Sequence, residues 1–131
     1  MTSYRILVTG ARSCTQQQAL YVENVIYAAA YAPMSRGDAV IVVQGECPYG
    51  GVDKVAENLA TSTKGLINEG HPADWKRLGR KAGMMRNGEM VAAGAEICLA
   101  FPNAQSTGTW DCIRKAAAAG IHVRIYPLVE S

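Results

Sequence analysis

The chain has 131 residues, a length that suits one domain with a core large enough to need no disulfides or metals. Its 13 Lys and Arg residues nearly balance its 11 Asp and Glu residues, so the bulk charge does not indicate a protein that binds nucleic acids or membrane surfaces. No apolar run approaches the roughly 20 residues that cross a bilayer, and the N-terminus lacks a signal-peptide pattern. We therefore expect a cytoplasmic protein with no membrane partner, in which all four cysteines are reduced thiols.

The first half of the chain alternates short apolar runs with helical patterns. Residues 4–9 form the first predicted strand, and residues 16–31 carry apolar side chains at helical spacing, which predicts a helix that Pro33 ends. Residues 39–43 are all apolar and include three Val, which is typical of a strand that is buried on both faces. The next helix is predicted at 52–62, directly after a glycine-rich loop.

The second half repeats this alternation. A weakly signalled strand is predicted at 65–69, and a helix that is basic in its first half at 76–93. A strand at 95–101, a helix at 108–119 and a last strand at 121–126 complete the pattern.

This order predicts an α/β fold: a single Rossmann-like, three-layer domain over residues 1–131, with a five-stranded parallel sheet and helices on both faces. We expect the strand order 3-2-1-4-5, which puts the topological switch point between the first and fourth strands. Ligands collect at such points in open α/β sheets. The loops after Gly10, Gly45 and Pro102 are therefore predicted to form one crevice.

The loop that follows the second strand is Gly45-Glu-Cys-Pro-Tyr-Gly-Gly-Val-Asp53. Gly45, Gly50 and Gly51 would let the backbone approach a ligand, and the helix N-terminus after them would favour an anion. Gly45 and Gly50 have the spacing of a Walker A motif, but Gly51 and Val52 replace its Lys and its Ser or Thr, which disfavours conventional NTPase chemistry. Asp53 either complements the helix dipole, binds ribose hydroxyls or acts as a general base.

The start of the helix at 108–119 is a second candidate anion site. Ser106, Thr107, Gly108 and Thr109 combine side-chain hydroxyls with N–H groups that lack helical partners. These residues either cap the helix or hold a phosphate. The phosphate interpretation is favoured if both helix N-termini open on the same crevice.

The loop after Gly10 argues against a dehydrogenase. It has only the first glycine of a G-x-G-x-x-G fingerprint, and no acidic residue ends the second strand to bind a ribose. Arg12 in this loop is either a solvated surface residue or a bidentate clamp for a phosphate or carboxylate.

Three residues further along are candidates for the crevice. Trp75 is either a core or lid aromatic, or a platform that stacks on a base. Arg86 and Asn87 are expected to face the crevice from the helix at 76–93. His71 is expected to be structural, and no second His or Cys stands near it at ligand spacing, so no metal site is predicted.

Five short segments occur in an order that is specific to one family, and they are Arg5-Ile-Leu-Val-Thr-Gly-Ala-Arg12, Gly45 to Asp53, His71-Pro-Ala-Asp-Trp75, Ala82-Gly83 with Arg86-Asn87 and Met90, and Ala100-Phe-Pro102 with Gly108-Thr109. Together they resemble the YspA-related branch of the SLOG superfamily, the DUF2493 proteins of bacteria and phages, over nearly the whole chain. The resemblance implies a Rossmann-like fold that binds a nucleotide or a nucleotide-derived ligand.

The wider superfamily includes the LOG phosphoribohydrolases, whose signature is P-G-G-x-G-T-x-x-E. Pro102, Gly108 and Thr109 match this signature, but a longer segment replaces the paired glycines and Cys112 stands in place of the catalytic glutamate. If the protein is a hydrolase of this kind, its candidate catalytic residues are Arg86, Asp53 and Asp111.

Three functions stay open. The first is binding of a nucleotide-derived small molecule, as a sensor or sponge that needs no cofactor; in it, Trp75 or Tyr49 covers the base. The second is cleavage of the N-glycosidic bond of a nucleoside monophosphate. The third, disfavoured by the near-neutral charge, is binding of single-stranded DNA as in the related DprA. LOG relatives are dimers, which implies a homo-oligomer here.

The predicted ligand-binding residues are Gly10, Arg12, Gly45, Tyr49, Gly50, Gly51, Asp53, Asp74, Trp75, Arg86, Asn87, Pro102, Ser106, Thr107, Gly108 and Thr109.

Overall fold

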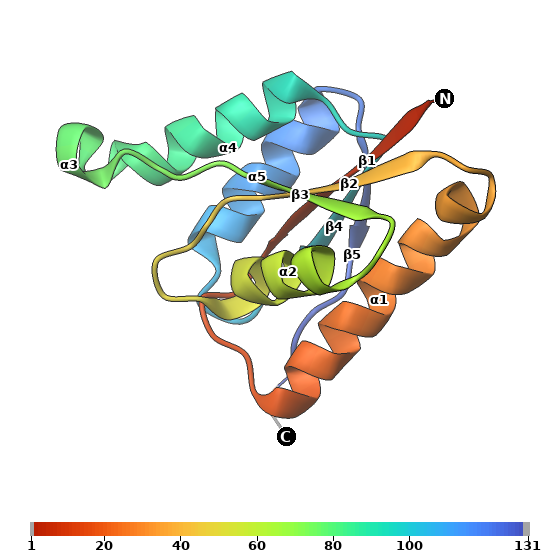
Figure 1. Ribbon diagram of the computed structural model, residues 1–131. Helices are drawn as coiled ribbons and strands as arrows, with labels where there is room; N and C mark the ends of the chain where they lie inside the picture. The colour runs from red at the N-terminus through yellow and green to blue at the C-terminus, as the bar shows by residue number, and fades with distance from the viewer. Residues whose placement is uncertain (1, 130–131) are drawn as a thin grey trace.

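The computed structural model describes residues 2–129 and contains a five-stranded, fully parallel sheet. The strands are β1 (Ser3–Gly10), β2 (Ala39–Gln44), β3 (Leu66–Gly70), β4 (Ile97–Phe101) and β5 (His122–Ile125). Their order across the sheet is β3-β2-β1-β4-β5 (Figure 1). The predicted α/β fold and its strand order are therefore confirmed.

Helices cover both faces of this sheet. They are α1 (Gln16–Ser35), α2 (Gly51–Ser62), α3 (Trp75–Leu78), α4 (Lys81–Ala93) and α5 (Thr107–Ala118). Figure 1 shows α1 and α2 on one side of the sheet and α4 and α5 on the other. Within residues 2–129, none of the helices combines the length and apolar character that a membrane span requires.

The side chains of β1 alternate between two cores because successive residues of a strand point to opposite faces. Ile6 and Val8 are fully buried in the larger core, beneath α1 and α2. Leu7 lies in the smaller core, with Met90 of α4 and Cys112 of α5. All five residues of β4 are buried, as expected of a strand with neighbours on both sides and helices on both faces.

The first helix is longer than predicted. α1 continues through Pro33 and ends at Ser35. Pro33 lies in the last turn, where it removes a single N–H group, and the N–H of Arg36 still bonds to the carbonyl of Ala32 at 3.2 Å. The chain then turns at Gly37, which has a φ of 87°.

The helix predicted at 76–93 is in fact two helices. Gly79, with a φ of 58°, ends α3, and its N–H bonds to the carbonyl of Trp75 at 3.0 Å. α4 then starts in a new direction after Arg80. The remaining predicted boundaries lie within two residues of those observed.

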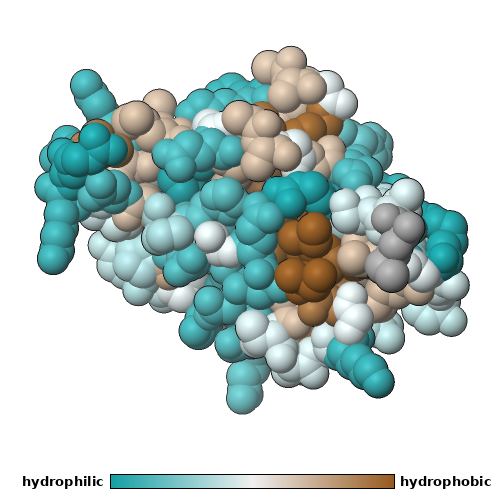
Figure 2. Space-filling view, turned by 45° about the horizontal axis from the view of Figure 1, so that its top comes forward, coloured by the Kyte–Doolittle hydropathy of each residue, from teal (hydrophilic) through white to brown (hydrophobic). Residues whose placement is uncertain are grey.

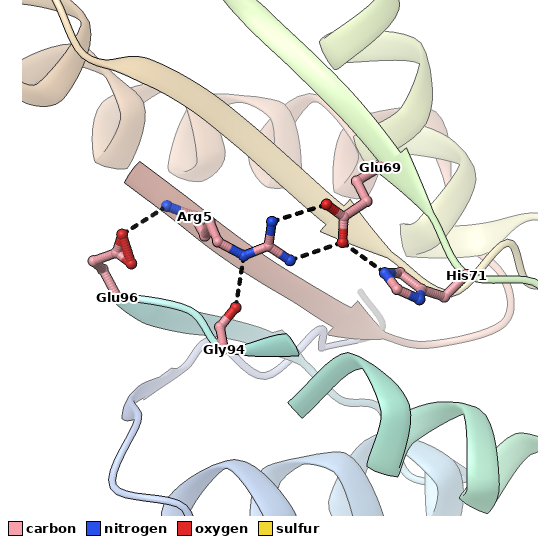
Figure 3. Close-up of polar contacts among 5 residues, drawn as sticks. All are labelled: Arg5, Glu69, His71, Gly94 and Glu96. Carbon is pink, nitrogen blue, oxygen red and sulfur yellow. Dashed lines mark hydrogen bonds and ion pairs between the residues drawn. The ribbon is translucent and has the colours of Figure 1, made fainter. Parts of the chain in front are cut away.

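An ion-pair cluster ties β1 to β3 across β2 (Figure 3). The guanidinium of Arg5 donates to both carboxylate oxygens of Glu69, at 2.8 and 2.7 Å, and to the carbonyl of Gly94 at 2.8 Å. His71 Nε2 lies 2.6 Å from Glu69 Oε2. The hydrogen bond from Arg5 is the main reason why the pKa of Glu69 falls to about 2. His71 therefore belongs to a structural cluster.

The helices leave part of the sheet uncovered on the face that carries Arg5 and Glu69. α5 packs on β1, β4 and β5, whereas Ile67 on β3 is 50% exposed. In Figure 2, apolar surface gathers over β2 and β3 with hydrophilic side chains around it. The cluster of Arg5, Glu69 and His71 thus lies at an edge of the sheet that the helices of residues 2–129 leave partly exposed on this side.

Candidate functional site

A cavity of about 430 Å³ lies at the carboxyl ends of β1 and β2, with α4 and α5 as its opposite wall. The loops after β1 and β4 meet there, because the N–H of Ala11 donates to the carbonyl of Phe101 at 3.0 Å. This is the switch point that the strand order predicts.

Predicted site residues reach this cavity from three parts of the chain. The end of β1 and the loop after it contribute Gly10 and Arg12, and the loop after β2 and the start of α2 contribute Tyr49 and Asp53. The segment of α3 and α4 contributes Trp75, Arg86 and Asn87. The start of α5 contributes Ser106, Thr107, Gly108 and Thr109, and Asp111 follows about one turn later.

Five predicted ligand-binding residues do not line the cavity: Gly45, Gly50, Gly51, Asp74 and Pro102. Asp74 is instead the N-cap of α3, where its carboxylate accepts a hydrogen bond from Arg77 Nε at 2.9 Å. Pro102 is buried, and its carbonyl accepts the N–H of Leu128 at 2.8 Å. Both residues serve local structure.

The glycine-rich loop contacts protein backbone where a ligand was predicted. Gly51 has a φ of 61°, and a Cβ at this position would collide with the carbonyl oxygen of Ala11. The N–H of Val52 donates to the same carbonyl at 3.0 Å. The loop after β1 therefore occupies the space beside Gly51 and the N–H of Val52, so these two residues serve the packing of the two loops.

Gly45 has a related role. A Cβ there would collide with the guanidinium of Arg86, which donates a hydrogen bond to the Gly45 carbonyl and, through Nε, to Asn87 Oδ1 at 3.0 Å. A side chain at position 45 would force the end of Arg86 to move, so glycine there permits this contact at the cavity wall.

The start of α5 keeps its N–H groups available. Ser106 does not cap the helix, because its hydroxyl donates to Asn103 Oδ1 at 2.7 Å. Among residues 2–129, no acceptor bonds to the N–H groups of Thr107, Gly108 or Thr109, and all three residues line the cavity. The helix dipole adds partial positive charge at the same point. This end of the cavity is suited to an anion.

Basic side chains surround the cavity. Arg12, Arg80, Arg86 and Arg114 all line it, and the guanidinium carbon of Arg12 lies 5.4 Å from the ring centre of Tyr49. Sequence reasoning did not single out Arg80 or Arg114. A signal for Arg114 exists, since it follows Thr107 by seven residues and so lies on the same face of α5.

Asp53 is a buried acid of the cavity, with 8% of its surface exposed. Burial raises its pKa to about 6, although the nearby charge of Arg86 and the N–H of Cys47, which donates to Oδ2 at 3.2 Å, act against this rise. A carboxyl group that titrates near neutrality can hydrogen-bond to hydroxyls or exchange a proton with them.

Asp111 is engaged by neighbouring side chains. Its Oδ2 accepts hydrogen bonds from Asn87 Nδ2 at 3.1 Å and from Lys115 Nζ at 2.9 Å. Burial raises the pKa of Asp111, but these two partners outweigh it, and the pKa lies below its usual value. Asp53 is therefore the better candidate for proton transfer.

The fold and the cavity define an open α/β protein with a basic cavity at its topological switch point. No protein-family model matches the chain. It is 36% identical over 125 residues to the Gene 61 protein of Mycobacterium phage D29, which corresponds to 91% of this chain and 93% of the phage protein. The chain belongs to the family of that phage protein.

A solved structure is also similar to the chain. It is the C-terminal domain of the PF1911 hydrogenase from Pyrococcus furiosus, with 18% identity and a TM-score of 0.47 over 95% of this chain and 92% of that domain.

Proposed function

We propose that the cavity binds a nucleotide or a nucleotide-derived small molecule, and that the protein is a sensor or sponge for it. The observation that carries this proposal is the start of α5, where the N–H groups of Thr107, Gly108 and Thr109 have no acceptor within residues 2–129 and line a cavity rich in arginine. Free N–H groups at a helix N-terminus are suited to phosphate. The volume of about 430 Å³ lies within the roughly 300–1,000 Å³ of small-molecule sites.

The geometry supports a role for each part of the cavity. The phosphate lies at the start of α5 with Arg12, since Arg86 is already held by Gly45 and Asn87. The ribose lies near Asp53. Trp75 and Tyr49, which are 42% and 71% exposed, offer faces on which a base can stack.

We also propose that the chain is a SLOG relative. The segments that resemble this superfamily supply Arg12, Asp53, Trp75 and Arg86 to one cavity, although they lie far apart in the sequence. One shared cavity would explain why these separate segments occur together in the chain, and this supports the proposal.

Calorimetric titration with AMP tests the binding proposal. One AMP should bind per chain, and Arg12→Gln should weaken binding by roughly tenfold or more, because hydrogen bonds to charged groups contribute about 1.5–3 kcal/mol. Arg124→Gln, on the exposed surface of β5, is the matched control and should leave the affinity within about twofold. Absence of heat from AMP, ADP and NAD with a folded protein would refute the proposal.

A second function, hydrolysis of the N-glycosidic bond of a nucleoside monophosphate, is favoured by Asp53 alone. A buried carboxyl group with a pKa of about 6 can accept a proton from the water that attacks the ribose carbon. If this occurs, adenine release from AMP rises with pH through about 6, and Asp53→Asn abolishes it. Chromatography that detects no adenine at high protein concentration removes this function and leaves the binding proposal intact.

A further inference from the structure

We infer that the ligand carries a second phosphate, separated from the first, and that Arg80 and Arg114 bind it. This inference rests on the proposed function, which assigns the first phosphate to the start of α5.

The charge of the cavity exceeds what one phosphate needs. Four guanidinium groups line it, against the carboxylates of Asp53 and Asp111. Asp111 is paired with Lys115 at 2.9 Å, and the charge of Arg114 also helps to lower the pKa of Asp111. A phosphate monoester carries a charge of about −1.5 to −2 at pH 7. With Lys115 counted, five cationic groups face two carboxylates, a net charge of +3, and one such group neutralises about 2 of it at most.

Two of these arginines form a second basic position along α5. Arg114 lies six residues after Gly108, about 9 Å along the helix axis. Lys115 Nζ donates to the carbonyl of Met84 at 2.7 Å, which holds the first turn of α4 against this part of α5. Arg80 immediately precedes α4 and lines the same cavity. The backbone of Arg114 is thus set apart from the N–H groups that begin α5, and Arg80 lines the cavity from the N-cap of α4.

Arg80 and Arg114 have no carboxylate partner within residues 2–129. In contrast, Arg5, Arg36 and Arg77 each form an ion pair with an acid of the protein. The two cavity arginines therefore keep their donors for another group.

The start of α4 gives an independent reason to expect an anion. Arg80 and Lys81 place two positive charges at the positive end of the α4 dipole, and the first turn contains no acidic residue. Because both side chains are exposed, this arrangement is only slightly unfavourable by itself. A bound phosphate would relieve it.

The separation of the two positions selects a class of nucleotide. The adjacent phosphates of a nucleoside diphosphate lie at one end of the molecule and would both be drawn to the start of α5. Phosphates on opposite sides of the ribose, as in a nucleoside 3′,5′-bisphosphate, can reach both positions.

Calorimetry with AMP, ADP and adenosine 3′,5′-bisphosphate tests the inference. The bisphosphate should bind the wild-type protein at least about tenfold more tightly than AMP or ADP, because charge-assisted hydrogen bonds are the strong ones. The double variant Arg80→Gln, Arg114→Gln should lose this advantage and bind the bisphosphate no more tightly than it binds AMP. Arg124→Gln removes the same kind of charge from the exposed surface of β5, away from the cavity. This control should therefore keep the tighter binding of the bisphosphate.

The outcomes separate the two proposals. If AMP binds and the bisphosphate gains nothing over AMP or ADP, the inference fails and the proposed function stands. If none of the three nucleotides binds, the inference and the proposed function both fail. The salt dependence is a second readout: the logarithm of affinity should fall more steeply with salt for the bisphosphate than for AMP in the wild-type protein, and equal slopes overturn the inference.

Discussion

At the scale of a single residue, the buried carboxyl group of Asp53 lowers the stability of the folded protein. Its carboxyl group is 8% exposed and has a pKa of about 6, against an ordinary value of 3.8. Between these two values the folded protein binds more protons than the unfolded chain, so the free energy of unfolding falls as pH rises. The charged form of Asp53 therefore destabilises the protein at neutral pH.

Replacement of this residue should stabilise the protein. Asp53→Asn keeps an oxygen that can accept the N–H of Cys47 and removes the buried charge. We expect the variant to exceed the wild type by up to about 3 kcal/mol in the free energy of unfolding at pH 7, and the difference to vanish near pH 4. Urea denaturation at both pH values measures it; equal stability at pH 7 would contradict the account.

The sequence was sufficient to predict those cavity residues whose role depends only on their own local structure. Thr107, Gly108 and Thr109 line the cavity as predicted, because a helix N-terminus exposes its N–H groups wherever it occurs. Arg80 was missed for a physical reason. One continuous helix over 76–93 groups Arg80 with the basic residues before it, whereas in the structure Gly79 ends α3 and Arg80 becomes the N-cap of α4.

At the scale of elements, the loop after β2 and the loop after β1 form one packed unit. Gly51 permits their contact, since its φ of 61° suits glycine and a side chain there would displace Ala11 and Arg12. The sequence shows that this loop needs glycine. It does not show whether a ligand or another loop fills the space, because that depends on which strands become neighbours.

Two glycine substitutions distinguish these effects. Gly37 also has a positive φ, 87°, but a Cβ there meets nothing within 4 Å. Gly37→Ala should cost about 1–2 kcal/mol, the backbone strain alone. Gly51→Ala should cost about 1–3 kcal/mol more, because the backbone of Ala11 must move. It should also weaken AMP binding, whereas Gly37→Ala should not. Equal costs in thermal or urea unfolding would show that the contact between the loops is unimportant.

The cluster of Arg5, Glu69 and His71 holds the open side of the sheet together. The pKa of Glu69 is lowered to about 2 from 4.5, so its contribution to stability is present above pH 4.5 and is lost as pH falls toward 2. Because Glu69 is partly exposed, we expect Glu69→Gln to cost only about 1 kcal/mol at pH 7, less at pH 3.

Glu57→Gln is the control for this substitution. Its ion pair with Lys54 joins residues of the same surface helix and should contribute less than about 0.5 kcal/mol. If Glu69→Gln and Glu57→Gln have the same small effect at pH 7, the cluster does not brace the sheet.

At the scale of the whole molecule, the alternation of strands and helices was sufficient to predict the fold. Parallel strands joined by right-handed crossovers leave few possible topologies, and the order 3-2-1-4-5 is one of these. The same topology brings residues as distant as Arg12 and Arg114 to one cavity. Burial of Asp53 and the resulting rise in its pKa depend on the finished packing, and no feature of the sequence indicates them.

The most direct test of the central claim is a titration of the ¹⁵N-labelled protein with AMP, followed through its backbone amide resonances. The account predicts large shifts for Thr107, Gly108 and Thr109, whose N–H groups receive the phosphate, and no shift for Gly37 and Gly120, which lie at helix ends outside the cavity. Unchanged resonances at the start of α5 while AMP saturates the protein would contradict it.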